Sequence, residues 1–95
     1  MLEVDVVRIS VIVPIYNVKL YIERCVRSLM EQTLENIEFI FVNDCTPDNS
    51  INVIQDVLKD YPSRKNQVKI VNLEINSGQA AARKRGVLEA TGEFV

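Results

Sequence analysis

Short apolar runs rich in β-branched residues alternate along this chain with longer segments of helical periodicity. The strand-like runs cover residues 9–15 (Ile-Ser-Val-Ile-Val-Pro-Ile), 38–42 and about 69–73, and Glu93 begins a fourth. Continuous apolar runs of this length are typical of strands that are buried on both faces of a parallel sheet. The order β-α-β-α-β-α-β therefore predicts a three-layer α/β/α fold, with a mainly parallel sheet and right-handed crossovers.

The first helix is expected soon after residue 17, because apolar residues recur there at intervals of four. Two neighbouring columns of side chains should face the sheet: Tyr21, Cys25 and Leu29 in one, and Ile22, Val26 and Met30 in the other. Cys25 is accordingly interpreted as a small core residue. The chain has two cysteines and no histidine, so Ser-His-Asp and Cys-His catalysis are excluded, and a reducing cytoplasm is the expected setting.

Two further helices are expected between the later strands. Thr46 and Pro47 form a favourable N-cap and N1 pair for the second helix, which should run to about Asp60. Its inward side chains should be Ile54, Val57, Leu58 and Tyr61. Ser77 should cap the third helix, and Gly92 is a suitable C′ residue at its end.

Composition and charge exclude several classes of protein. The net charge is −2 and the pI is near 5.1, whereas a general nucleic-acid binder normally carries a basic surplus. Glu3 and Asp5 make the N-terminus too acidic for a secretory signal. The motifs G-x-G-x-x-G and G-x-x-x-x-G-K-[ST] are absent, which disfavours a dinucleotide oxidoreductase and a P-loop NTPase.

Three polar segments follow the first three predicted strands, at residues 16–17, 43–45 and 76–78. In an open parallel sheet, ligands bind beyond the carboxyl ends of the strands. These segments are far apart in the sequence, but the fold should make them neighbours. They therefore mark the expected ligand site.

Asp44 is the most informative residue of these segments as a candidate for ligand binding, because it follows an apolar strand almost directly. Its carboxylate could accept an N–H group from a nucleobase, or it could satisfy loop amides in an Asx-turn, and both interpretations stay open here. Asp48, close to the start of the second helix, is interpreted as a source of helix-start electrostatics.

The other two segments also offer ligand groups. Tyr16 could stack on a planar base or lie at the rim of the site, and Asn17 could hold the loop or cap the first helix. Gly78 suits a tight turn before a helix whose N–H groups could point toward phosphate. Arg83 lies about a turn and a half into that helix, where it could reach a diphosphate or remain at the surface.

Together the motifs resemble a single family. They are IxVIVPxYN in residues 9–17, S-L-x-x-Q-T in residues 28–33, IEFIFVND in residues 37–44, P-D-N-S in residues 47–50 and N-x-G-x-x-x-A-R in residues 76–83. In order and spacing they resemble the family 2 glycosyltransferases of GT-A fold. The resemblance implies a Rossmann-like GT-A half-domain over residues 1–95, from a bacterial-type enzyme. Such an enzyme transfers a sugar from a nucleotide donor, usually UDP-linked, to an acceptor hydroxyl of a glycan or lipid-linked glycan.

The resemblance assigns nucleotide binding to seven positions. They are Pro14, Tyr16, Asn17, Asp44, Asn76, Gly78 and Arg83. Asp44 matches the second acidic position of the family's D-D-G-S loop and would contact the base. The chain departs from the family pattern at Asn43, where an aspartate is expected, at Cys45, where a glycine is expected, and at Lys84, where an asparagine often stands. The first two changes alter the charge and the flexibility of the loop.

The resemblance also implies that this single domain is incomplete, with its sequence ending in the fourth strand at Val95. In the family that strand leads to a D-x-D motif, whose aspartates hold Mg²⁺ or Mn²⁺ on the donor diphosphate. The metal ligands and the catalytic base would then lie beyond Val95. No catalytic or metal-binding residue is expected within this chain, and the chain alone should be inactive.

Two alternatives remain. The chain could be a non-catalytic remnant that binds partners, and an unpaired edge of its first strand would then favour a homodimer. A nucleotide-sugar pyrophosphorylase is disfavoured, because residues 16–19 lack the glycine- and arginine-rich loop of that class. The full protein is expected in the cytoplasm, with the inner face of the membrane as an alternative location.

Overall fold

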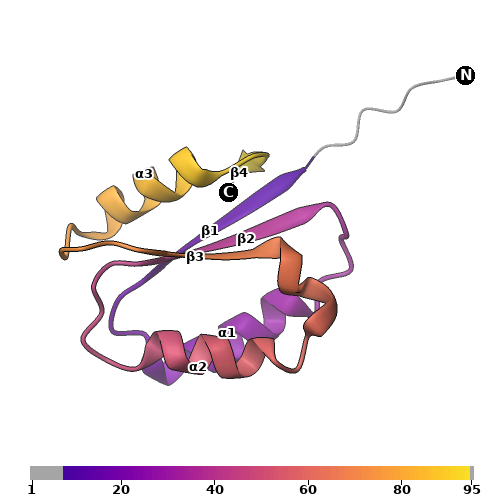
Figure 1. The fold of residues 1–95 in the computed structure, drawn as a ribbon, viewed down its shortest axis with the longest axis horizontal. Helices are drawn as coiled ribbons and strands as arrows, with labels where there is room; N and C mark the ends of the chain where they lie inside the picture. Colours follow the sequence, from indigo (N-terminus) through magenta and orange to yellow (C-terminus); the bar gives the residue numbers. More distant parts are fainter. Residues whose placement is uncertain (1–7, 95) are drawn as a thin grey trace, which may run out of the picture.

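A computed structural model describes residues 8–94, and its ribbon is drawn in Figure 1. The elements are β1 (Ile9–Ile15), α1 (Lys19–Met30), β2 (Ile37–Asn43), α2 (Ser50–Leu58), the 3₁₀-helix η1 (Pro62–Gln67), β3 (Val68–Asn72), α3 (Gln79–Glu89) and β4 (Glu93–Phe94). The predicted alternation of strands and helices is confirmed. The third strand lies one residue earlier than expected.

The four strands form one parallel sheet in the order β3-β2-β1-β4. Ile15 of β1 pairs with Asn43 of β2, which pairs in turn with Asn72 of β3. The carboxyl ends of these three strands therefore lie in one row. β4 flanks β1, as predicted, and pairs with Ile9 and Ser10.

The helices cover both faces of the sheet, with α1 and α2 on one side and α3 on the other (Figure 1). The larger core lies beneath α1 and α2, and its fully buried side chains include Phe39, Phe41 and Ile54. A smaller cluster lies beneath α3. There Gly86 allows a close approach, because a Cβ atom at this position would be 2.4 Å from the Cγ2 atom of Ile12.

One of the two apolar columns on α1 packs as expected. Ile22, Val26 and Met30 are buried in the larger core. Tyr21 is 70% exposed and Cys25 is exposed, so the interpretation of Cys25 as a core residue is wrong. A helix that packs on a sheet buries only a limited stripe of its surface. Here the column that contains Tyr21 and Cys25 lies beside the edge of β1.

The starts and ends of α2 and α3 differ from the expected caps. α2 begins at Ser50 rather than after Thr46, because the carboxylate of Asp48 accepts the Ser50 N–H group at 3.1 Å. The N-cap of α3 is Gly78 rather than Ser77. α3 also ends at Glu89, so Gly92 is not its C′ residue.

Gly92 belongs instead to a polar cluster around the buried side chains of Ser10 and Glu38, at the amino ends of β1 and β2. We call this cluster the amino-edge clasp, and it consists of Ser10, Glu38, Thr91 and Gly92. The Oε1 atom of Glu38 accepts hydrogen bonds from the Ser10 hydroxyl at 2.5 Å and from the Thr91 N–H group at 2.7 Å. The Gly92 N–H group donates to the Ser10 hydroxyl at 3.1 Å. The clasp fixes the connection between α3 and β4 to the two central strands.

No helix within residues 8–94 is long and apolar enough to cross a membrane.

Candidate nucleotide site at the carboxyl edge

The loops after β1, β2 and β3 are joined to one another by hydrogen bonds. The Asp44 N–H group donates to the Ile15 carbonyl at 3.0 Å, and the Leu73 N–H group donates to the Asn43 carbonyl at 2.9 Å. The Asn17 N–H group donates to the Thr46 hydroxyl at 2.9 Å. These bonds bring together the three segments that the sequence marks as a ligand site.

A hollow of about 300 Å³ opens between these loops. Its lining residues are Pro14, Tyr16, Val18, Asp44, Asn76, Gly78 and Gln79. Asn17 and Arg83, which were also predicted, do not line it. Val18 and Gln79 were missed, although Gln79 could have been found, since it directly follows the glycine of the N-x-G motif.

Asp44 is 2% exposed, and its carboxylate connects the second loop to the third. Its Oδ1 atom accepts the Ser77 N–H group at 2.7 Å, and its Oδ2 atom accepts the Gly78 N–H group at 2.9 Å. The side chain of Asn76 also donates to Asp44. The carboxylate therefore satisfies loop amides, but those of the loop between β3 and α3 rather than those of its own loop.

Asp48 organises the other half of the second loop. It accepts hydrogen bonds from the hydroxyl groups of Thr46 at 2.7 Å and Ser50 at 2.6 Å, and from the Lys19 N–H group at 3.1 Å. Burial raises the pKa of the Asp48 carboxyl, but these bonds outweigh burial and lower the pKa to about 2. The interpretation of Asp48 as a helix-start residue is confirmed, since it serves the first turns of both α1 and α2.

Asn17 and Arg83 lie outside the hollow for different reasons. Asn17 adopts a left-handed backbone conformation, with φ 53°, and its side chain does not cap α1, whose N-cap is Val18. Arg83 is exposed on α3. It lies four residues after Gln79 and so shares a helix face with a residue that lines the hollow.

Each of the three loops contains one residue with positive φ. These are Asn17 at 53°, Cys45 at 56° and Gly78 at 88°. Left-handed backbone costs a residue with a Cβ atom about 1–2 kcal/mol, whereas glycine adopts it freely. Cys45 therefore carries backbone strain at the position where the family pattern has glycine.

We expect Cys45→Gly to raise the free energy of unfolding by about 1 kcal/mol, because relief of the strain exceeds the added entropy of the unfolded chain. Urea denaturation would measure the change. Cys45→Ala is the matched control: it removes the same thiol but keeps the Cβ atom, so it should give no gain. Equal stabilities of the two variants would contradict the strain argument.

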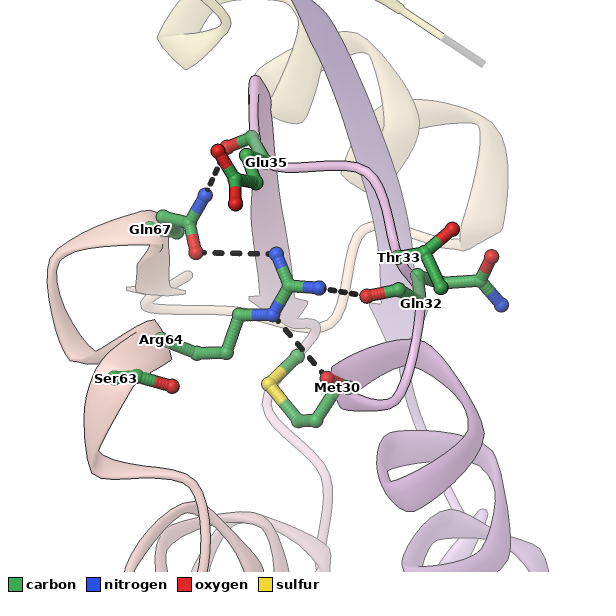
Figure 2. Close-up of a pocket in the computed structure, with 7 residues that line it drawn as sticks. All are labelled: Met30, Gln32, Thr33, Glu35, Ser63, Arg64 and Gln67. Carbon is green, nitrogen blue, oxygen red and sulfur yellow. Dashed lines mark hydrogen bonds between the residues drawn. The ribbon is translucent and has the colours of Figure 1, made fainter.

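A second hollow, of about 550 Å³, lies near the amino ends of β2 and β3, opposite the candidate site (Figure 2). Arg64 of η1 lies at its centre, with its guanidinium directed at the end of α1 and the connection to β2. It donates to the carbonyl groups of Met30 at 3.2 Å, Leu34 at 2.9 Å and Gln32. Gln67 links Arg64 to the Glu35 carbonyl. Because backbone carbonyls take these donors, the arrangement serves structure rather than ligand binding.

Within the described residues, no group of three or more histidine, cysteine, aspartate or glutamate side chains could hold a metal ion. The residues that line the carboxyl-edge hollow include one carboxylate, that of Asp44. The other lining residues include the aromatic ring of Tyr16 and the side-chain amides of Asn76 and Gln79, which could hold a planar, hydrogen-bonding molecule.

Comparisons with known proteins agree with this fold. A sequence profile described as "Glycosyl transferase family 2" matches residues 10–95. The chain belongs to this family of glycosyltransferases, which are enzymes of GT-A fold.

Individual relatives extend beyond the present chain. The chain is 40% identical, over 87 residues, to the uncharacterized glycosyltransferase EpsJ of Bacillus subtilis. The matched region covers 92% of this chain and 24% of EpsJ. The mannosyltransferase PcManGT from Pyrobaculum calidifontis, solved with GDP-Man and Mn²⁺, superposes with a TM-score of 0.82 at 25% identity. That match covers 90% of this chain and 25% of PcManGT.

Staphylococcus aureus TarS 1–349, in complex with UDP-GlcNAc, superposes with a TM-score of 0.76 at 31% identity. The match covers 93% of this chain and 26% of the TarS chain. The chain thus spans about a quarter of the length of each of these three proteins.

Proposed function

We propose that this chain forms the donor-nucleotide half of a glycosyltransferase. The full enzyme would transfer a sugar from a nucleoside diphosphate, most simply UDP, to a hydroxyl group of an acceptor glycan or lipid-linked glycan in cell-envelope synthesis. One observation carries the proposal: the loops after three parallel strands meet around one hollow, and most of the predicted nucleotide-binding residues line it. The two exposed free cysteines support a location in the reducing cytoplasm or at the inner face of the membrane.

Each part of a nucleotide has a matching part of the site. Tyr16, which is 44% exposed at the hollow, offers its ring to stack on the base. The N-terminus of α3 begins at the same hollow, and its unpaired N–H groups favour phosphate. Arg83 would add positive charge from the same helix face as Gln79.

The resemblance to the family implies Mg²⁺ or Mn²⁺ on the donor diphosphate, where the cation would neutralise charge on the leaving group. Residues 8–94 provide no cluster of ligands that fits such an ion. The role that we propose for these residues is the binding of the donor nucleotide.

An NMR titration with UDP tests the proposal. We expect shifts at Tyr16, Asp44 and Gly78 that do not depend on added Mg²⁺. Tyr16→Ala should weaken binding about tenfold, because stacking of a base on an aromatic ring contributes about 1–3 kcal/mol. Tyr21→Ala is the matched control, since Tyr21 is exposed but does not line the hollow. No shifts at millimolar UDP, or equal weakening by both variants, would refute the proposal.

A second candidate function is self-association. β4 pairs with β1 at Ile9 and Ser10, so within the described residues Val11–Ile15 have a strand neighbour on the β2 side alone. An unpaired apolar strand edge favours pairing with another chain. We therefore propose a homodimer through β1, which sedimentation velocity at increasing concentration would detect. A monomer at the highest concentration would count against the dimer.

A further inference from the structure

The outer edge of β3 borders an apolar hollow that is separate from the nucleotide site. Within residues 8–94, β3 pairs with β2 alone, so its other edge has no strand neighbour. A hollow of about 470 Å³ lies beside this edge, and its lining includes the half-buried side chains of Leu58, Val68 and Ile70. An open strand edge with apolar pockets beside it is suited to bind an extended peptide as an added strand.

Lysine side chains surround this edge. Lys59 and Lys65 line the hollow. Lys69 of β3 lies on the other face of the sheet, where it donates to the Glu89 carbonyl of α3 at 3.4 Å. Lys59 is paired with Asp56 at 3.2 Å, but within the described residues neither Lys65 nor Lys69 forms a salt bridge. Lysines on an edge strand oppose the pairing of two identical edges, so the β3 edge favours an acidic extended segment.

The N-terminal sequence has the pattern that this edge requires. Residues 2–7 read Leu-Glu-Val-Asp-Val-Val, with apolar residues at positions 2, 4 and 6 and acidic residues at positions 3 and 5. Successive side chains of an extended strand point to opposite faces, so this sequence would have one apolar face and one largely acidic face. Added to β3, it would direct the apolar face to the hollow and the acidic face to the side that carries Lys69.

The segment can pair along the whole of β3 only if it comes from another copy. A strand added to β3 would lie three strand spacings from β1, which is about 14 Å. Crossing that distance takes about four residues, and only seven residues precede Arg8. Within one copy, about three residues would then remain to pair with β3. A segment from a second copy has no such constraint and can pair with all of Val68–Asn72.

We propose that residues 2–7 of one copy bind as an added strand along β3 of a second copy. Their apolar side chains fill the hollow beside α2 and η1, and their carboxylates lie beside Lys69. This interface does not involve the edge of β1, and it does not depend on the proposed nucleotide function.

Reversal of charge on both sides tests the interface, with association of the full chain measured by sedimentation velocity over a range of concentrations. The double variant Lys65→Glu/Lys69→Glu should weaken association at least tenfold, because like charges then face each other. Glu3→Lys/Asp5→Lys should weaken it for the same reason. A chain that carries all four substitutions should associate within a few-fold of the unsubstituted chain, since opposite charges face each other again.

Arg24→Glu/Lys84→Glu is the matched control. It changes the net charge by the same amount at two exposed residues that do not line the hollow, so association should be unchanged. Equal weakening by the control, or no recovery in the fourfold variant, would overturn the proposal. Association that neither double reversal weakens would also overturn it and would favour the edge of β1 as the interface.

NMR on an equimolar mixture of ¹⁵N-labelled and ¹³C-labelled chains locates the segment. Isotope-filtered NOEs between copies should join residues 2–7 of one copy to Val68–Asn72 of the other. An associated sample without these NOEs would overturn the exchange of the segment. A monomer at the highest concentration would overturn it as well.

Discussion

Glu38→Gln should lower the free energy of unfolding at neutral pH by about 3 kcal/mol. This is the largest loss of stability that we expect from removing one charge without changing the size of the side chain. Glu38 is 2% exposed in the amino-edge clasp. Burial raises the pKa of its carboxyl, but the hydrogen bonds from Ser10 and Thr91 and the charge of Arg8 outweigh burial. They lower the pKa from 4.5 to about 2.

The pH dependence of stability follows from this shift. The folded state has the lower pKa, so the contribution of Glu38 is complete above pH 4.5 and is lost as the pH falls through about 2. Urea denaturation between pH 7 and pH 2 should show the gap between the unsubstituted chain and Glu38→Gln closing over that window. Glu23→Gln, which removes an exposed partner of Arg27, should cost less than about 1 kcal/mol at every pH. A gap for Glu38→Gln that is constant with pH would contradict the ionic explanation.

Arg64→Met should lower the free energy of unfolding by about 2 kcal/mol, because it removes charge-assisted hydrogen bonds to the end of α1 and to the connection before β2. The guanidinium also lies 5.7 Å from the centre of the Phe39 ring. Denaturation in urea would measure the loss, and faster amide exchange in residues 31–36 would locate it.

Two further variants separate geometry from charge at this position. Arg64→Lys keeps the positive charge but cannot reach several carbonyl groups at once, so it should recover little of the loss. Arg24→Met removes an exposed arginine of α1 and should be nearly neutral. Full recovery by lysine would show that charge alone matters there.

The order of the elements could be predicted from the sequence because it depends on local patterns. The run of residues 37–43 is apolar enough to specify a buried strand, and the position of β4 beside β1 follows from the topology. The exposure of Cys25 could not be predicted, because both columns on α1 are apolar and the sheet edge decides which one is buried. The start of α2 was missed because Asp48, two residues before Ser50, replaces the expected cap of Thr46.

The candidate site was predictable in part for a similar reason. Residues such as Tyr16 and Gly78 directly follow strands or precede a helix, so topology alone brings them together. Whether Arg83 lines the hollow depends on the direction of its long side chain, and the topology of the fold does not specify that direction. The bonds of Asp44 to Ser77 and Gly78 join positions 33 and 34 residues apart, and no local pattern indicates them.

The amino-edge clasp also bears on the order in which this chain can fold. β1 and β2 pair across 28 residues, whereas Gly92 reaches Ser10 across 82. During synthesis from the N-terminus, Glu38 therefore meets Ser10 long before Thr91 exists to share its carboxylate. Until then the Glu38 carboxylate, at the amino end of β2, lacks the two hydrogen bonds that Thr91 donates to it. The amino-edge clasp should therefore be completed late in folding, and its contribution to stability should appear mainly as a slower rate of unfolding.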